Sequence, residues 1–101
     1  MAVGLRVDVA FFNGRQEAVK AIQEDSTIGV AVYPWKIFET VCHILICRNY
    51  VDADRINAGL LTQRGLDVHF GSSVFQSQVF RGDKPTLKAE LAAALGANII
   101  E

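Results

Sequence analysis

One segment constrains the fold of this chain more than any other. Residues 27–33 are dense in valine and isoleucine and contain almost no polar side chain. A strand of this composition is typical of a sheet that other elements cover on both faces. The chain must therefore provide helices for both sides of a sheet, and the segment favours a layered α/β or α+β domain.

A strand and a helix are predicted before this segment. Residues 5–12 alternate in part, are rich in valine and phenylalanine, and end at Asn13-Gly14, which is a turn signal. We expect Asn13 to cap a helix that runs to about Asp25 and buries a narrow stripe of Ala18, Val19 and Ile22. The resulting β-α-β unit should hold its two strands parallel, with a right-handed crossover.

The segment 35–48 is ambiguous. Pro34 suits the first turn of a helix, and apolar residues then recur at helical spacing, namely Trp35, Phe38, Val41, Cys42 and Leu45. Residues 41–47 also contain β-branched side chains, which favour a strand. We interpret the segment as a helix, and the choice between helix and strand for 41–47 stays open.

The next expected element is another helix. Asp52 is a suitable N-cap, and Arg64 followed by Gly65 is a suitable C-terminus, because a cation and a glycine are both favoured there. The face that this helix buries is expected to consist of Ala53, Ile56 and Leu60.

The last third of the chain predicts a hairpin, a helix and a short strand. Residues 66–70 and 74–80 are two strands around a Gly-Ser-Ser turn. The clearest helix of the chain covers 85–95, and Gly96 follows its end. Residues 98–101 are expected to form a terminal strand.

The predicted order of elements is therefore β-α-β-α-α-β-β-α-β, in a layered domain with a mixed sheet. At 101 residues we expect a single globular domain over 1–101, because a second core would be too small. Half of the residues are apolar and 21% are charged, which excludes the disordered and fibrous classes.

Charge and processing signals constrain partners and location. The formal net charge is −1, and the charges are spread over both halves of the chain, so no basic patch is expected for nucleic acid and none for a membrane. No spanning segment, secretory signal or cofactor motif is present, and Cys42 and Cys47 are expected to be free, buried thiols, so we expect a cytoplasmic protein without a cofactor. The mean hydropathy of +0.23 predicts a homo-oligomer that covers some apolar surface.

The best candidate site is the rim where the first two strands end. Ligands of open α/β sheets collect outside the carboxyl ends of parallel strands, and a helix N-terminus there favours an anion. The first strand end offers Asn13, Gly14 and Arg15 at a helix N-terminus, and the second offers the aromatic and cationic residues Tyr33, Trp35 and Lys36. If the two strands are neighbours, these six residues would share one rim.

Weaker candidates lie elsewhere. On a helix, the side chains of His43 and Cys47 would be in contact. The imidazole could then activate the thiol, or the two side chains could supply two zinc ligands, although core packing explains both residues better. A serine nucleophile beside a base is conceivable at a turn that holds His69, Ser72 and Ser73. Asp52 and Asp54 resemble a magnesium pair, and Lys84 and Lys88 could line an anion site, although pairing with Asp83 explains these lysines more simply.

Three functions from different classes remain. The leading hypothesis is a non-catalytic, oligomeric module that binds a small molecule, an anion or a protein partner. The first alternative is a small enzyme that acts on an anionic substrate at the strand-end rim. The second is a regulatory protein that touches nucleic acid through arginines that a helix could partly align, namely Arg48, Arg55 and Arg64.

Overall fold

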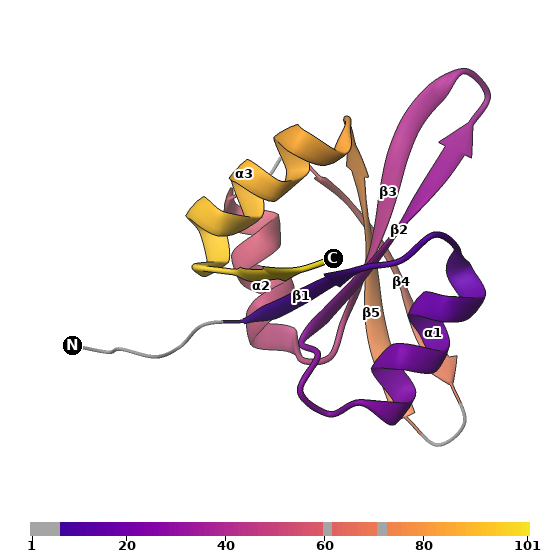
Figure 1. Cartoon of the computed structure of the whole chain (residues 1–101), viewed down its shortest axis with the longest axis vertical. Coiled ribbons are helices and arrows are strands. Elements are labelled where there is room, and N and C mark those ends of the chain that lie inside the picture. Colours follow the sequence, from indigo (N-terminus) through magenta and orange to yellow (C-terminus); the bar gives the residue numbers. More distant parts are fainter. Residues whose placement is uncertain (1–6, 60–61, 71–72) are drawn as a thin grey trace.

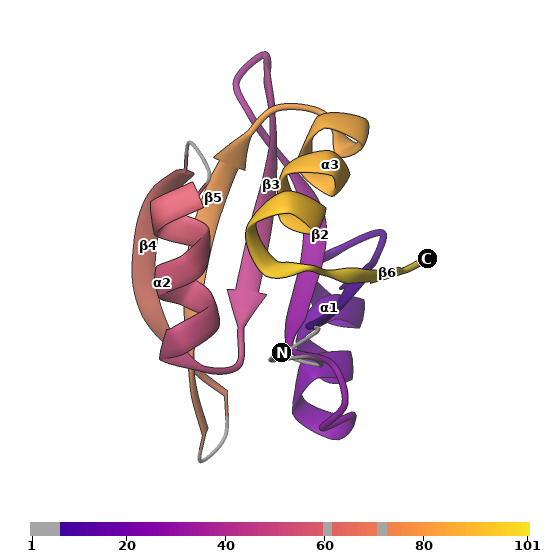
Figure 2. The same ribbon diagram turned by 90° about the vertical axis from the view of Figure 1, so that its left-hand side faces the viewer.

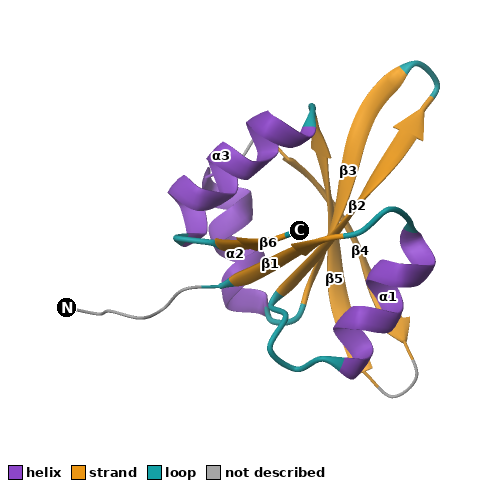
Figure 3. Cartoon of the chain, in the orientation of Figure 1, coloured by secondary structure: helices purple, strands orange, loops and turns teal. Residues whose placement is uncertain are grey.

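The structure is a computed structural model that describes residues 7–59, 62–70 and 73–101. Its described elements are strands and helices in mixed order, with two pairs of consecutive strands (Figure 3). In chain order they are β1 (Asp8–Phe11), α1 (Arg15–Glu24), β2 (Val30–Ile37), β3 (Thr40–Cys47), α2 (Tyr50–Gly59), β4 (Thr62–Phe70), β5 (Ser73–Arg81), α3 (Lys84–Leu95) and β6 (Asn98–Ile100).

The described strands form one mixed sheet in the order β4-β5-β3-β2-β1-β6. β1 pairs in parallel with β2 and with β6, which confirms the parallel pair expected for the first β-α-β unit. The remaining neighbours are antiparallel, including β4 and β5, which form the hairpin that the sequence predicts. The fold class is therefore confirmed as a mixed sheet with helices in separate layers.

Helices cover both faces of the sheet (Figure 1). α1 lies on one face, and α2 and α3 lie on the other. Because side chains alternate along a strand, Val30 and Val32 pack towards α2 and α3, whereas Ala31 and Tyr33 pack towards α1. All four are buried, which confirms that the segment 27–33 supplies a strand covered on both sides.

The helix predicted for 35–48 is wrong, because these residues form a β-hairpin. β2 continues through Pro34 to Ile37, and β3 pairs antiparallel with it from Thr40 to Cys47. Proline is tolerated in β2 for a reason that the backbone shows. Val32 O accepts a hydrogen bond from Phe12 N, so the backbone of Val32, and of Pro34 two residues later, faces the β1 side, where β1 has ended at Phe11.

Two expected helix caps are also wrong. Gly14, and not Asn13, is the N-cap of α1, and it makes no side-chain cap bond. At the start of α2, Asn49 Oδ1 accepts from Asp52 N at 2.9 Å, so Asn49 caps the helix and Asp52 lies in its first turn.

The predicted end of α2 is wrong as well. The helix ends at Gly59, and Arg64 and Gly65 belong to β4. Ala53 and Ile56 are fully buried as expected, whereas Leu60, the third residue of the predicted face, lies outside the described residues.

The helix predicted for 85–95 is confirmed with a one-residue extension. Asp83 caps α3 by accepting from Thr86 N at 2.9 Å, and Gly96 ends it in the left-handed conformation with φ 61°. The inward face of α3 is fully buried, and it consists of Leu87, Leu91 and Leu95. The chain then returns to the sheet as β6, which confirms the short terminal strand.

Candidate functional site

The predicted rim exists only in part. β1 and β2 are parallel neighbours, with Phe11 opposite Val32, so their carboxyl ends do meet at one edge of the sheet. α1 starts at this edge after Gly14, as expected. No helix starts at Pro34, because β2 continues past the edge into the hairpin. Of the two helix N-termini expected at this rim, only that of α1 is therefore present.

Three of the predicted site residues are brought together on the α1 side of the sheet. Tyr33 hydrogen-bonds Arg15, and the Tyr33 ring meets the Trp35 ring edge to face with centroids 6.4 Å apart. Burial raises the pKa of the Tyr33 phenol, and the nearby Arg15 guanidinium counteracts part of that effect. The group is thus a phenol held between a cation and an indole.

The other three predicted residues lie apart from this group. Gly14 caps α1, and Asn13 lines a pocket on the α3 side of the sheet. Lys36 points to the same side as Pro34 and pairs with Glu39 at 3.9 Å near the tip of the hairpin. The six residues therefore do not share one rim, because alternation along β2 divides them between two faces.

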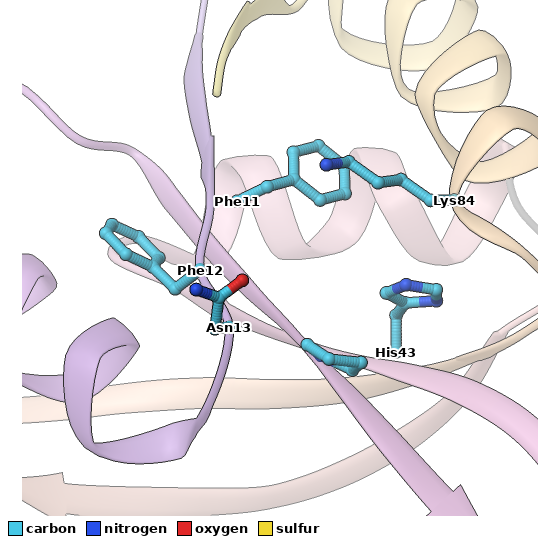
Figure 4. Close-up of a pocket in the computed structure, with 6 residues that line it drawn as sticks. Phe11, Phe12, Asn13, His43 and Lys84 are labelled. Atoms are coloured by element: carbon cyan, nitrogen blue, oxygen red, sulfur yellow. The ribbon is translucent and has the colours of Figure 1, made fainter.

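We call the cavity beside Asn13 the strand-end pocket (Figure 4). Its volume is about 200 Å³, and its walls come from the end of β1, the hairpin and the start of α3. The ammonium group of Lys84 lies 4.9 Å from the centre of the Phe11 ring, and the His43 ring meets Phe11 edge to face at 6.5 Å. The lining residues are Phe11, Phe12, Asn13, Pro34, His43 and Lys84.

His43 has a fixed orientation in this pocket. Its ring is buried, and Nδ1 lies 3.1 Å from Gly82 O. Because a carbonyl oxygen only accepts, Nδ1 carries the proton and donates it.

Lys84 and Lys88 do not pair with Asp83 as expected. Both ammonium groups bind the carboxylate of Glu101, with Lys84 Nζ 2.7 Å from Oε1 and Lys88 Nζ on Oε2. Hydrogen bonds from the two lysines lower the pKa of Glu101 to about 2. The Asp83 carboxylate is instead engaged with Thr86 at the start of α3, and that hydrogen bonding lowers its pKa.

The lowered pKa of Glu101 predicts that its ion pairs with Lys84 and Lys88 break only in strong acid. Its folded pKa lies below the ordinary value of 4.5, so its ion pairs are complete above that pH and are lost as the pH falls towards 2. Observed by carboxyl NMR, Glu101 should titrate near pH 2. In the double variant Lys84→Gln, Lys88→Gln the midpoint should return towards 4.5, and an unchanged midpoint would show that the lysines are not the cause.

The hairpin of β2 and β3 projects from the body of the domain (Figures 1 and 2). β1 ends opposite Val32, and β5 pairs with β3 only as far as Cys42, so residues 34–41 have neighbouring strands only within the hairpin. We call residues 34–41 the arm. Its turn holds Phe38, whose side chain is 92% exposed and whose φ is +56°.

The arm carries further exposed apolar surface and a hollow. Val41 is 53% exposed on the side of the strand-end pocket, and Trp35 is 45% exposed on the side of α1. Near the tip, a second hollow of about 240 Å³ is lined by Phe38, Thr40, Cys42 and Arg81. Because a helix was predicted for residues 35–48, the arm was not predicted. The missed signal was a pair of β-prone runs on either side of Phe38-Glu39.

Gly82, which lies just before α3, is hydrogen-bonded to β3 at the base of the arm. It donates its N–H to Val41 O at 3.1 Å, and its carbonyl accepts from His43. Its φ of 154° lies in a region that side chains rarely adopt, and a Cβ would stand 2.7 Å from Cε2 of Phe80.

Substitution of this glycine should therefore be costly. We expect Gly82→Ala to lower the free energy of unfolding by about 2 to 3 kcal/mol, because both backbone strain and a clash are added. Gly96→Ala is the matched control, since a Cβ there meets nothing within 4 Å, and it should lose only about 1 kcal/mol. Urea unfolding measures both, and equal losses would contradict the role of the Phe80 contact.

The contact considered between His43 and Cys47, for which packing was the favoured interpretation, is not formed. On a strand the two residues face the same side but are separated by Leu45, and Cys47 is fully buried. Burial, together with the charge of Asp52, raises the pKa of the Cys47 thiol to about 12. Cys47 therefore lacks the contact with His43 and the exposure that an activated thiol needs. Both cysteines are free and buried, as expected.

The remaining candidates do not assemble into a site. Among the described side chains no group of three or more metal-ligating residues is found, so Asp52 and Asp54 have no third ligand there. The proposed serine site at His69, Ser72 and Ser73 falls at a turn whose residues 71–72 lie outside the described part of the chain.

The three arginines are not aligned by a helix. Arg48 precedes α2, Arg55 lies on it, and Arg64 belongs to β4. Arg48 donates to Ile28 O at 2.8 Å, to Asp25 O at 3.0 Å and to Ile22 O, and Arg55 donates to Ala94 O at 3.2 Å. Arg48 and Arg55 thus bind carbonyl groups of their own chain.

Two findings concern the whole described chain. Across residues 7–59, 62–70 and 73–101, no helix has the length and apolar character needed to cross a membrane. Comparison of the sequence and structure with protein-family models, curated proteins and solved structures finds no match.

Proposed function

We propose that this chain is a non-catalytic binding module that docks to a protein partner through the arm. The observation that carries this proposal is Phe38, an aromatic side chain with 92% of its surface exposed at the tip of a projecting hairpin. Exposed apolar groups concentrated on one protruding element are typical of interaction sites.

The conformation of Phe38 supports the same conclusion. A non-glycine residue in the left-handed region is strained by about 1 to 2 kcal/mol. Leaving its ring in water also forgoes about 2 kcal/mol of burial. Neither effect helps this chain to fold, since glycine or asparagine would suit the turn better. Contact with a partner therefore explains an aromatic side chain at this position, whereas folding does not.

Docking by side chains fits the arm better than the addition of a strand. The open edge of β2 beyond β1 begins with Pro34, which has no N–H to donate, and continues to the charged Lys36. Proline and lysine are typical of edges that resist pairing with another strand. The partner should therefore contact the exposed rings and methyl groups of the arm.

Site-directed photocrosslinking tests the proposal. A benzophenone-bearing phenylalanine analogue replaces Phe38 in the full chain inside the cells that express it, and Tyr50, which is 55% exposed at the start of α2, is the matched control position. We expect a protein adduct of defined mass from position 38 and none from position 50. Equal labelling, or none at either position, would refute docking through the arm.

A second candidate function is supported by the strand-end pocket. The Phe11 ring and the ammonium group of Lys84, which also binds Glu101, lie at the carboxyl end of a parallel strand and suit a small aromatic anion. Benzoate is a suitable probe. It should raise the melting temperature of the protein but not of Lys84→Gln, and equal shifts in both proteins would place the site elsewhere.

A further inference from the structure

We propose that the arm docks a short acidic segment of its protein partner, in which carboxylates flank one aromatic or aliphatic side chain. This inference rests on docking through the arm and adds the chemistry of the partner. The receiving surface is the side of the arm that faces α1. We call the hollow on this side, near the tip, the tip hollow, and it is lined by Phe38, Thr40, Cys42 and Arg81.

Strand register places the tip hollow on the same side of the sheet as α1. Cys42 is a register partner of Trp35 in β2 and of Arg81 in β5, so the three residues form one row across the sheet. The Trp35 ring contacts Tyr33, which packs towards α1, and this contact fixes the side of the row. Cys42 is buried between the exposed residues Trp35 and Arg81, whose backbones lie about 10 Å apart at the usual strand spacing.

The tip hollow has room for one apolar side chain. Its volume is about 240 Å³, and cavities of about 150 Å³ can bind benzene. Phe38 supplies an aromatic wall, and Trp35, which is 45% exposed, lies in the neighbouring strand beside Cys42. A phenyl or leucine side chain of the partner would therefore pack on Phe38 and remove apolar surface of the arm from water.

The α1 side of the arm carries positive charge. Arg81 is exposed at the tip hollow, and the described lining of this hollow includes no carboxylate. Arg15 is exposed on the same side and is hydrogen-bonded to Tyr33. Burial raises the pKa of the Tyr33 phenol, so the phenol is uncharged at neutral pH and does not neutralise Arg15. Guanidinium groups bind carboxylates in a planar, two-pronged geometry, which suits an acidic segment.

The carboxylates of the arm and of the adjoining helix starts have other partners. Glu39 pairs with Lys36, which points to the side of the strand-end pocket. Asp83 caps α3, and the carboxylate of Glu17 lies by Gly14 at the N-terminus of α1, where the helix dipole favours an anion. The α1 side of the arm is thus locally positive, although the formal net charge of the chain is −1, and it complements an acidic partner.

Nucleic acid fits this surface less well than an acidic peptide. Its affinity comes from several phosphates that are neutralised along the strand, whereas the described α1 side of the arm offers Arg15 and Arg81. One or two carboxylates beside an apolar side chain match this number of cations. A thymidine oligonucleotide that binds beside Trp35 more tightly than an acidic peptide would overturn this choice.

Trp35 allows the proposal to be tested at the site itself, because it is the only tryptophan of the chain and its fluorescence reports on the α1 side of the arm. The probe is the capped peptide Asp-Glu-Phe-Glu-Asp, added to the purified chain up to about 5 mM at about 50 mM salt. The control peptides are Asn-Gln-Phe-Gln-Asn and Asp-Glu-Ala-Glu-Asp. We expect a saturable change in the emission of Trp35 with the probe and none with the controls. No change with the probe, or an equal change with either control, would overturn the proposal.

Two further measurements test the role of charge. Arg81→Gln should raise the dissociation constant of the probe roughly 10-fold, because a charge-assisted hydrogen bond is lost. Lys20→Gln removes the same charge from the side of α1 that faces away from the sheet, and it should change the constant less than about 2-fold. In the native protein, about 300 mM salt should weaken binding several-fold. Equal losses in the two variants, or binding that does not depend on salt, would contradict recognition through Arg81.

The photocrosslinking experiment separates this inference from the docking on which it rests. A protein adduct from position 38 that maps to a segment with aspartate or glutamate within about three residues, the extended length of the row from Trp35 to Arg81, supports both. An adduct with a segment that lacks acidic residues leaves docking through the arm intact and overturns the acidic segment, as does an adduct together with a probe peptide that does not bind. The absence of any adduct overturns both.

Discussion

Replacement of Leu91 by alanine is expected to lower the free energy of unfolding by about 3 kcal/mol. Leu91 is fully buried at the centre of α3, where it packs among Val9, Val30 and Leu45 of the sheet core. The substitution removes buried methyl groups and leaves a cavity that a close-packed interior fills only in part. For a domain of this size the melting temperature should fall by roughly 15 °C.

Val51→Ala is the control for this prediction. Val51 lies on α2 with 67% of its surface exposed, so the loss of its methyl groups should change stability by less than about 0.5 kcal/mol. Urea unfolding measures both variants. A Leu91→Ala variant as stable as Val51→Ala would show that α3 is not packed as described.

Replacement of Arg48 by alanine is the second large effect that we expect, at about 2 to 3 kcal/mol. The guanidinium group donates to carbonyl oxygens of Ile22, Asp25 and Ile28, and it lies 5.7 Å from the centre of the Phe75 ring. α1 has no basic residue in its own last turn, so Arg48 supplies the positive charge at its C-terminus. Alanine would remove the guanidinium donor from all three carbonyl groups, of which Asp25 O would still accept from Ile28 N at 3.2 Å.

Two further variants make this prediction specific. Arg48→Lys should recover less than half of the loss, because an ammonium group cannot reach several carbonyl groups in the way that a planar guanidinium can. Arg55→Ala removes a single bond to Ala94 and should cost about 1 kcal/mol. Full rescue by lysine, seen in denaturant unfolding, would contradict the proposed multiple contacts.

The sequence predicted the elements that local patterns determine. The helix at 85–95 has its apolar periodicity and its terminal glycine together, and the structure reproduces it within one residue. The parallel pair of β1 and β2 followed from two strand-like runs joined by a helix of the right length. In both cases one short window contained all the signals needed.

The arm could not be predicted with the same rules. Its turn, at Phe38 and Glu39, contains no glycine, asparagine or proline, and Pro34 argued for the end of the strand. Whether proline is tolerated at position 34 depends on where β1 ends, which is a property of the assembled sheet. The apolar spacing of 35–45 then fitted a helix as well as two strands.

Of the residues that line the strand-end pocket, Asn13 is the one that the sequence indicated. Asn13 lies where the carboxyl end of β1 was expected to form a pocket. His43 and Lys84 reach the same cavity from β3 and α3, and no local pattern links these distant positions. Arg48 was grouped with nucleic-acid contacts because its carbonyl partners lie 20 to 26 residues earlier in the chain.

We expect the pairing of β6 with β1 to form late in folding. Asn98 stands opposite Asp8 in parallel register, and their side chains are hydrogen-bonded at 3.1 Å across nearly the whole length of the chain. A contact so distant in sequence closes a large loop and forms slowly. During synthesis on the ribosome, the edge of β1 that pairs with β6 therefore keeps its backbone unpaired until the last residues of this segment have emerged.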